Sequence, residues 1–456
     1  MKWIRAVLGL LFCTAVTLFL SAITPRYLAW AAELQLLPAL LAVNIAAIAF
    51  ILLITLVFGR IYCSVICPQG VFQDFFFALR TRIFRSRGGH FVPERKWLRY
   101  GFFVLFCALL LCGVQAAVAL FAPYSAYGRM VRTVLALADG SAWAPPALAV
   151  SIVAVITFVL VGLLAFFGGR TWCNTLCPVG TLLGFFSRFS LLRPVLDTDK
   201  CVSCGKCERG CKSSCIDIRN KRIDYSRCVV CFDCLSDCKF GAMKYRFAYR
   251  RQSSGSAVDS GRRRFISGSA LLLGAGVSAR AKSLAGGPEA APLLPRPVPP
   301  GSGSRARFFS KCTACQACVT ACPNGVLRPS TDLAHLMQPE MGFDKGYCRP
   351  ECNACSLVCP TDAIRPFARE QKPDIHFGYA SVDLERCVVN TDGVQCGNCA
   401  RHCPAGAIRM VASGEGGHRV PSVDTERCTG CGACEYLCPA KPVSAIRVTG
   451  REIHIM

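Results

Sequence analysis

Histidine and acidic residues are scarce in this chain of 456 residues. There are 28 Asp+Glu against 52 Lys+Arg, and six histidines. The histidines are His90, His335, His376, His402, His418 and His454. No long apolar stretch contains one of them, and the motif C-x-x-C-H does not occur. These absences exclude a membrane haem with two histidine ligands and a covalently attached haem.

Cysteine, in contrast, is abundant, with 32 residues, of which 25 follow residue 200. Twenty-four of them form six quartets with the spacing C-x2-C-x2-C-x3-C or a close variant. The quartets are Cys201, Cys204, Cys207 and Cys211; Cys228, Cys231, Cys234 and Cys238; Cys312, Cys315, Cys318 and Cys322; Cys348, Cys352, Cys355 and Cys359; Cys387, Cys396, Cys399 and Cys403; and Cys428, Cys431, Cys434 and Cys438. Runs this regular and crowded, in a chain this long, exclude a small disulfide-bonded scaffold.

The quartet spacing is typical of ligands to 4Fe–4S clusters. Three thiolates two residues apart surround one face of a cubane, and the fourth ligates the other cluster of a pair. Cys211 is therefore expected to join the quartet that begins at Cys228, and Cys238 the one that begins at Cys201. Zinc sites use two separated C-x-x-C pairs instead. We expect all 24 cysteines to be metal ligands of six 4Fe–4S clusters.

Two of the late quartets carry insertions. Three residues separate Cys348 from Cys352, and eight separate Cys387 from Cys396. Both insertions fall between the first and second ligands, where a loop can bulge without moving the rest of the motif. Two pairings of the four late quartets are open. Neighbours can pair, first with second and third with fourth, or the first can pair with the fourth in a nested arrangement. We favour the pairing of neighbours.

The formal net charge of +24 would by itself indicate a nucleic-acid partner. Each cluster held by four thiolates carries roughly −2, so six clusters lower the charge to about +12. No aromatic stacking platform accompanies the basic residues, and eight of them lie in one loop where they orient a membrane protein. Nucleic acid is therefore not an expected partner.

Four apolar stretches precede the first quartet, at about residues 6–23, 37–58, 101–121 and 147–167. Each is long enough to cross a hydrocarbon core of roughly 30 Å at about 1.5 Å per residue. The loop 60–100 carries eight Lys/Arg against two acidic residues, which places it and both ends of the four-helix segment in the cytoplasm. The sequence predicts an α-helical membrane bundle of four transmembrane helices, followed by α+β modules like bacterial ferredoxins.

An internal repeat indicates that the bundle has two-fold symmetry. The motif G-R-x-x-C-x3-C-P-x-G begins at Gly59 and recurs at Gly169. A C-x3-C pair sets two thiols one helical turn apart, and the repeat can bring four together. These candidate redox or metal thiols are Cys63, Cys67, Cys173 and Cys177. They could hold a metal or cluster, cycle between thiol and disulfide, or be structural. The other four cysteines are expected to be small apolar fillers: Cys13, Cys107, Cys112 and Cys215.

A second targeting signal lies inside the chain. Residues 261–281 hold three consecutive arginines, a phenylalanine, a weakly apolar run and Ala279-Arg280-Ala281, the pattern of a Tat signal or a possible fifth span. A proline-rich spacer follows. The expected domains are a membrane bundle at 1–196, a cytoplasmic two-cluster module at 197–247, the signal and linker at 248–304, and a periplasmic four-cluster module at 305–456.

Residues 1–250 resemble the NapH-type quinol dehydrogenase membrane component, which has four spans, two GRxxCxxxCPxG motifs and a cytoplasmic ferredoxin pair. Residues 262–456 resemble the NapG/MauM ferredoxin-type proteins, with a Tat signal, four clusters and a long gap like that between Cys387 and Cys396. The chain looks like a fusion of the two. The resemblance implies that quinol from the quinone pool is oxidised at the bacterial inner membrane, and that electrons pass through clusters to a periplasmic cytochrome c or reductase.

The function expected from the sequence is thus membrane-bound iron–sulfur electron transfer, with a possible role as a quinol dehydrogenase component. The Tat machinery is an expected partner for export of the late quartets. An accessory donor of electrons for maturation or reactivation of a periplasmic metalloenzyme is an alternative that the MauM resemblance keeps open. A carrier of electrons outward from a cytoplasmic ferredoxin is a third.

Overall fold

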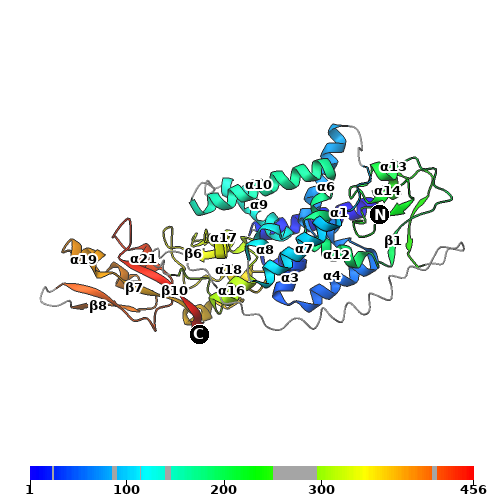
Figure 1. Ribbon diagram of the computed structural model, residues 1–456. Coiled ribbons are helices and arrows are strands. Elements are labelled where there is room, and N and C mark those ends of the chain that lie inside the picture. The colour runs from blue at the N-terminus through cyan, green and yellow to red at the C-terminus, as the bar shows by residue number, and fades with distance from the viewer. Residues whose placement is uncertain are drawn as a thin grey trace.

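The computed structural model describes residues 1–22, 25–84, 90–112, 115–138, 145–249, 295–412 and 418–455. A helical bundle forms the middle of the molecule, with a small cysteine-rich module at one end and a larger one at the other (Figure 1). We call residues 192–249 the two-quartet module and residues 295–455 the four-quartet module. The Tat-like segment 261–281 lies outside the described residues.

Short helices interrupt the long ones throughout the bundle. Its helices are α1 (Lys2–Leu20), α2 (Pro25–Glu33), α3 (Leu36–Ala42), α4 (Ile45–Phe58), α5 (Tyr62–Val65), α6 (Pro68–Ile83), α7 (Lys96–Leu111), α8 (Gln115–Phe121), α9 (Pro123–Ala138), α10 (Pro145–Gly168), α11 (Thr171–Thr175) and α12 (Pro178–Ser187). Among the described residues, two helical segments are long and apolar enough to cross a membrane, Lys2–Leu20 and Leu148–Gly168. They match the first and fourth expected spans.

The second and third expected spans are not continuous helices, contrary to the sequence-based expectation. The stretch 37–58 breaks at Val43, which has a φ of 60°, and restarts after Asn44, whose side chain accepts a hydrogen bond of 3.1 Å from the Ala47 N–H. Asn44, a polar residue within this apolar stretch, thus caps the N-terminus of α4. The stretch 101–121 is likewise divided between α7 and α8. Helices broken in this way occur in membrane proteins where surrounding protein satisfies the freed backbone groups.

The sequence repeat is also a structural repeat. A long apolar helix (α4 or α10) ends at a glycine with positive φ, +81° at Gly59 and +64° at Gly169. One short helix follows in each copy, and then the Cys-Pro step begins the next helix, with proline in its first turn. The first cysteine of each motif therefore lies in the short helix, and the second caps the helix that follows.

The two-quartet module is built on small antiparallel sheets. Strand β1 (Leu192–Leu196) pairs with β4 (Met243–Phe247), and β2 (Ile216–Asp217) with β3 (Arg222–Ile223). Two short helices, α13 (Lys206–Arg209) and α14 (Asp233–Asp237), carry the cysteines that end each triplet. This is the α+β arrangement expected for a ferredoxin-like module.

The four-quartet module repeats this plan at greater length. Its helices are α16 (Arg305–Lys311), α17 (Ala317–Ala321), α18 (Ala354–Leu357), α19 (Val388–Thr391), α20 (Asn398–Arg401) and α21 (Ala433–Tyr436), with 3-10 turns η2 (Leu333–His335), η3 (Arg369–Asp374) and η4 (Leu384–Arg386). Its strand pairs are β5 (Leu327–Pro329) with β6 (Pro339–Met341), β7 (His376–Val382) with β10 (Ile446–Ile455), and β8 (Ile408–Ala412) with β9 (Arg419–Val423). The end of the proline-rich segment belongs to this module, since Val298 is fully buried and the Pro295 carbonyl accepts a 2.7 Å hydrogen bond from Gly450.

Candidate iron–sulfur centres

The first two quartets meet in the crossed arrangement expected from their spacing. One cavity is lined by Cys201, Cys204, Cys207 and Cys238. A second cavity is lined by Cys211, Cys228, Cys231 and Cys234. Each cavity thus takes three thiols from one quartet and the last thiol of the other, which is the ligand set of a two-cluster ferredoxin.

Cys215 lines the second of these cavities as well, which the sequence reasoning missed. It is 1% exposed, and its Sγ lies 3.5 Å from Sγ of Cys211. It is therefore no mere apolar filler, because it contacts a cluster ligand directly. The one signal in the sequence is its position four residues after Cys211, which repeats the step from Cys207 to Cys211 and adds a fifth cysteine to the run.

The third and fourth quartets also pair as neighbours, and again they cross. Burial is the main cause that raises the pKa of Cys312, Cys315 and Cys318, and the nearby sulfur of Cys359 raises all three further. The Cys355 pKa is raised by burial and then by Cys348 and, less strongly, by Cys322. The last thiol of each quartet thus lies with the other quartet's triplet.

The fifth and sixth quartets repeat the arrangement. Burial and then the neighbouring sulfurs, among them Cys403, raise the pKa of Cys434. The Asn398 side chain beside Cys399 donates a 2.6 Å hydrogen bond to the carbonyl of Leu437, the residue before Cys438. Neighbour pairing therefore extends to both halves of the four-quartet module.

The ligand spacing of these sites fits a cluster rather than a single ion. Zinc sites take two separated C-x-x-C pairs, whereas the quartets follow C-x2-C-x2-C-x3-C or a close variant of it. Among the described residues, no group of three or more His, Cys, Asp or Glu side chains is arranged to hold one metal ion.

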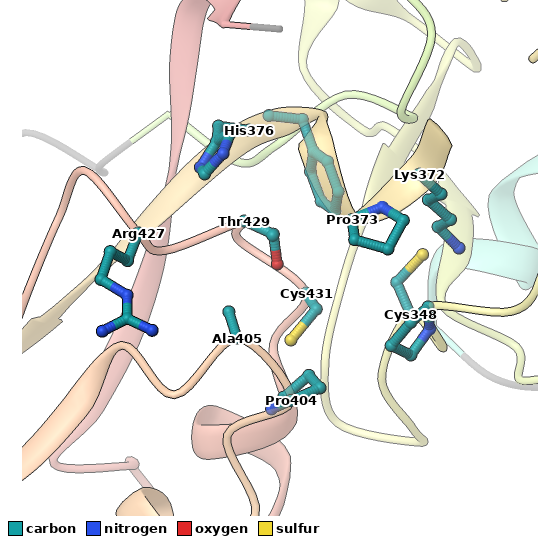
Figure 2. A pocket seen from close by; sticks show the side chains of 11 residues that line it. Cys348, Lys372, Pro373, His376, Pro404, Ala405, Arg427, Thr429 and Cys431 are labelled. Atoms are coloured by element: carbon teal, nitrogen blue, oxygen red, sulfur yellow. The ribbon is translucent and has the colours of Figure 1, made fainter. Parts of the chain in front are cut away.

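A cavity of about 350 Å³ lies where the two halves of the four-quartet module meet (Figure 2). Cys348 and Cys431, from two different cluster pairs, both line it, and the Cys348 N–H donates a 2.9 Å hydrogen bond to the Cys431 carbonyl. Lys372, buried on the same wall, donates to the carbonyl of Cys352. This contact makes a short connection between the two cluster pairs.

The four thiols of the repeated motif converge in the bundle, and we call them the tetrathiol site. Cys63, Cys67, Cys173 and Cys177 are each 3–4% exposed. Burial and then the sulfurs of Cys173 and Cys63 raise the pKa of Cys67. The same two sulfurs, with that of Cys67, raise the pKa of Cys177 beyond the effect of burial. The structure thus brings together all four residues that the repeat singled out.

Each half of the tetrathiol site is held by the arginine of the other half. Arg170 donates a 2.7 Å hydrogen bond to the carbonyl of Cys63, and Arg60 a 3.2 Å bond to that of Cys173. A Cβ at Gly70 or Gly180 would lie 2.0 Å from one of these carbonyls, so only glycine fits. The residues that the two copies of the motif have in common therefore act together, because they close a two-fold symmetric site.

The tetrathiol site lies directly against the two-quartet module. The Ser226 carbonyl, two residues before Cys228, accepts a 3.0 Å hydrogen bond from Arg60. The Lys212 carbonyl, next to Cys211, accepts a 2.8 Å bond from the backbone N–H of Arg170. The loops that carry a cluster's ligands are thus hydrogen-bonded to the arginines that close the tetrathiol site.

Thiols in quartets, held in ferredoxin-like modules, define an iron–sulfur electron-transfer protein. Family models agree: a 4Fe–4S binding domain matches residues 40–87 and 150–195, another matches 307–328, and a 4Fe–4S dicluster domain matches 394–441. The chain belongs to the family of ferredoxin-type proteins that includes MauM and NapF.

Three relatives illustrate the extent of the similarity. The methylamine utilization ferredoxin-type protein MauM of Methylobacillus flagellatus is 34% identical over 34% of this chain and 68% of its own length. Ferredoxin-type protein NapF of Haemophilus influenzae is 32% identical over 32% of this chain and 76% of its own. Ferredoxin-type protein NapG of Escherichia coli is 32% identical over 31% of this chain and 64% of its own. Each alignment covers about a third of the chain.

Proposed function

We propose that this protein oxidises quinol in a bacterial inner membrane and passes the electrons through 4Fe–4S clusters to a periplasmic cytochrome c or reductase. The observation that carries the proposal is the position of the helical bundle between two ferredoxin modules (Figure 1). The clusters supply the one-electron chemistry when bound. The protein's own residues space them, bury them and fix the charge around them.

Contacts along helix α1 locate the two modules and the tetrathiol site relative to the length of the bundle. Near its start, Lys2 pairs with Asp233 beside Cys234 at 2.8 Å. Its first turn also brings Arg5 to 3.4 Å from the carbonyl of Ser64, next to the tetrathiol site. Near its end, Thr17 contacts the hydroxyl of Tyr127 at 2.7 Å, at the border of the four-quartet module.

At about 1.5 Å per residue, the tetrathiol site lies roughly 5 Å along α1 from the contact with the two-quartet module and about 18 Å from the contact at Thr17. It therefore groups with the first two quartets. We assign it as a further redox or metal centre at that end of the bundle, supported by the 4Fe–4S binding-domain match that includes both C-x3-C pairs.

The proposed placement in the membrane rests on the same helical bundle and the same two modules. The proposal has four membrane crossings, two of them by broken helices, with residues 197–247 in the cytoplasm and 305–456 in the periplasm after Tat-dependent export. It treats the chain as a fusion of a NapH-type membrane component with a NapG/MauM-type protein. Most of the exposed large apolar side chains in the bundle lie on α1, α4, α7 and α10, as a lipid-facing surface requires.

The proposal is tested by anaerobic purification of the full chain, with iron and sulfide counted, followed by mixing with a reduced menaquinone analogue. EPR signals of reduced clusters should appear within the time of turnover. If quinol reduces no cluster while dithionite reduces them, quinol oxidation is wrong although the clusters are present.

A second candidate function, which the resemblance to the MauM proteins keeps open, is occasional electron supply for maturation or reactivation of a periplasmic metalloenzyme. Here the clusters would be reduced slowly by quinol, and the partner would be a precursor or inactive enzyme. A steady-state assay with a soluble cytochrome c acceptor distinguishes the two, because sustained turnover fits only the first.

A further inference from the structure

Four arginines are completely or almost completely buried in the bundle, and they differ in what neutralises them. The set is Arg60, Arg99, Arg129 and Arg170, each at most 1% exposed. Arg99 pairs with Glu94 at 2.7 Å and Arg170 with Asp74 at 2.9 Å. No carboxylate among the described residues pairs with Arg60 or Arg129. A buried charge without a partner is strongly destabilising, so each requires another source of negative charge.

Both of these arginines, which have no carboxylate partner in the described part of the chain, lie at cysteines. Arg60 reaches Sγ of Cys63 at 3.8 Å in the tetrathiol site. Arg129, on α9, lies at the border with the four-quartet module, where its neighbour Gly128 packs against Cys315 so closely that a Cβ would lie 2.4 Å from the Cys315 carbonyl. Burial lowers the pKa of Arg129 to about 10, and the nearby sulfur of Cys315 opposes that shift.

The guanidinium of Arg129 also has unused hydrogen-bond donors. One of its nitrogens, Nη1, donates to the carbonyl of Ala119, whereas Nε and Nη2 are buried and have no hydrogen-bond partner in the described part of the chain. The hydroxyl of Tyr124, five residues earlier on α9, is likewise buried without a hydrogen-bond partner among the described residues, and burial and then the sulfurs of Cys315 and Cys359 raise its pKa. Two buried polar side chains of α9 thus lie near Cys315.

We propose that Arg129 is a tuning residue, whose positive charge raises the reduction potential of the cluster held by Cys312, Cys315, Cys318 and Cys359. This rests on the part of the proposed function that places a cluster at those four residues. Reduction adds one electron and makes the cluster more negative, so a fixed positive charge in a buried, weakly screening site stabilises the reduced form more than the oxidised one. The cluster nearest the bundle thereby becomes the favoured entry point for electrons into the four-quartet module.

The test is an anaerobic redox titration of the full chain followed by EPR, with iron and sulfide counted for every variant. Arg129→Gln removes the charge, and Arg129→Lys retains it. Arg328→Gln is the matched control, because it also removes one arginine charge but from an ion pair with Asp344. Cys359→Ser identifies which EPR signal belongs to the cluster in question.

In Arg129→Gln we expect the equilibrium constant for reduction of that one cluster to fall at least tenfold, a midpoint lower by about 59 mV or more for a one-electron couple. Arg129→Lys should keep most of the wild-type value, and Arg328→Gln should leave every signal in place. Superimposable titrations of Arg129→Gln and wild type, with equal iron content, would show the inference to be wrong.

Two further outcomes distinguish a failure of this inference from a failure of the proposed function on which it rests. If Arg129→Gln raises the KM for quinol and leaves the potentials unchanged, the arginine binds the quinone head group and the tuning role is rejected. If Cys359→Ser loses no iron and no EPR signal, no cluster is present at these cysteines, and the proposed function fails at that step instead.

Discussion

At the scale of single residues, buried charges hold the bundle to the two-quartet module. Asp74 on α6 accepts from Arg5 at 2.9 Å and from Arg170 at 3.0 Å, and it lies 3.6 Å from Lys212. These three cations come from α1, from the second repeat and from a loop of the two-quartet module. One carboxylate thus joins three separate segments, and its loss would leave Arg5 and Arg170 without their anion, whereas Lys212 would keep its pair with Asp233 at 3.2 Å.

The pairing of Asp74 predicts a specific dependence of stability on pH. Although burial opposes it, Arg170 and the other two cations lower the pKa of Asp74 from 3.8 to about 2. Because the folded pKa is the lower one, this stabilisation is complete above about pH 5 and is lost as the pH falls toward 2. It amounts to about 2 kcal/mol at neutral pH.

The measurement is denaturant unfolding in detergent at several pH values. Asp74→Asn should be less stable by about 3–5 kcal/mol at pH 7, since it removes one partner of a buried network. The free energy of unfolding of this variant should also lose the dependence on pH that the wild type shows between pH 5 and 2. A wild-type stability that is flat over this range would contradict the prediction.

The tetrathiol site makes a second prediction at this scale. Cys63→Ser or Cys173→Ser should lower the iron and sulfide content by one centre and leave the other EPR signals in place. Cys112→Ser is the control, because Cys112 is exposed and lies apart from both motifs. Unchanged iron and sulfide in both motif variants would mean that these thiols are structural.

At the scale of elements, helix α9 positions the four-quartet module on the bundle. Its Gly128 makes the close approach to the Cys315 carbonyl, and its neighbour Tyr127 contacts α1 through Thr17. Phe19 and Leu20, at the end of α1, belong to the same buried cluster of apolar residues as Phe308 and Cys315. The end of the bundle and the first outer ligand loop therefore share one core.

Gly128→Ala tests this docking. The added methyl group cannot fit against backbone, so the contact should weaken by about 1–3 kcal/mol, as other overpacked sites do. Gly101→Ala, on α7, is the matched control because no atom lies within 4 Å of its Cβ position. Iron content should stay at the wild-type value in both, while reduction of the four-quartet module by quinol slows only in Gly128→Ala. Equal rates in the two variants would disprove the role of this contact.

Cysteine spacing is a local signal, and it predicted the crossed pairing and the meeting of the four motif thiols. Hydropathy predicted the positions of the apolar helices but not the break at Val43, because a run of apolar residues looks the same whether one helix or two form within it. In the sequence, Asn44 is only a polar residue within an apolar run, and its role as the N-cap of α4 becomes clear in the structure. The contact between Gly128 and Cys315 joins positions far apart in the chain and leaves no local pattern, so Arg129 could not be found from the sequence.

At the scale of the whole molecule, the sites follow one another along its length. The two-quartet module and the tetrathiol site lie at one end of the bundle, and Cys315 lies against the other end. Within the four-quartet module, the contact between Cys348 and Cys431 joins the first cluster pair to the second. The insertion after Cys387 forms α19, at the end of the molecule away from the bundle (Figure 1). Its residues 391–395 are exposed, where an electron acceptor could approach.

This order predicts opposite effects for two ligand substitutions. Cys315→Ser removes the site nearest the bundle, so quinol should no longer reduce the rest of the four-quartet module, although dithionite still should. Cys387→Ser removes the site farthest from the bundle, so quinol should still reduce the remaining clusters, whereas transfer to an external acceptor should fall at least tenfold. Stopped-flow mixing with quinol, followed by EPR of frozen samples, measures the first effect, and cytochrome c reduction measures the second. The two variants would behave alike if electrons entered the module at several points, and the linear order would then be wrong.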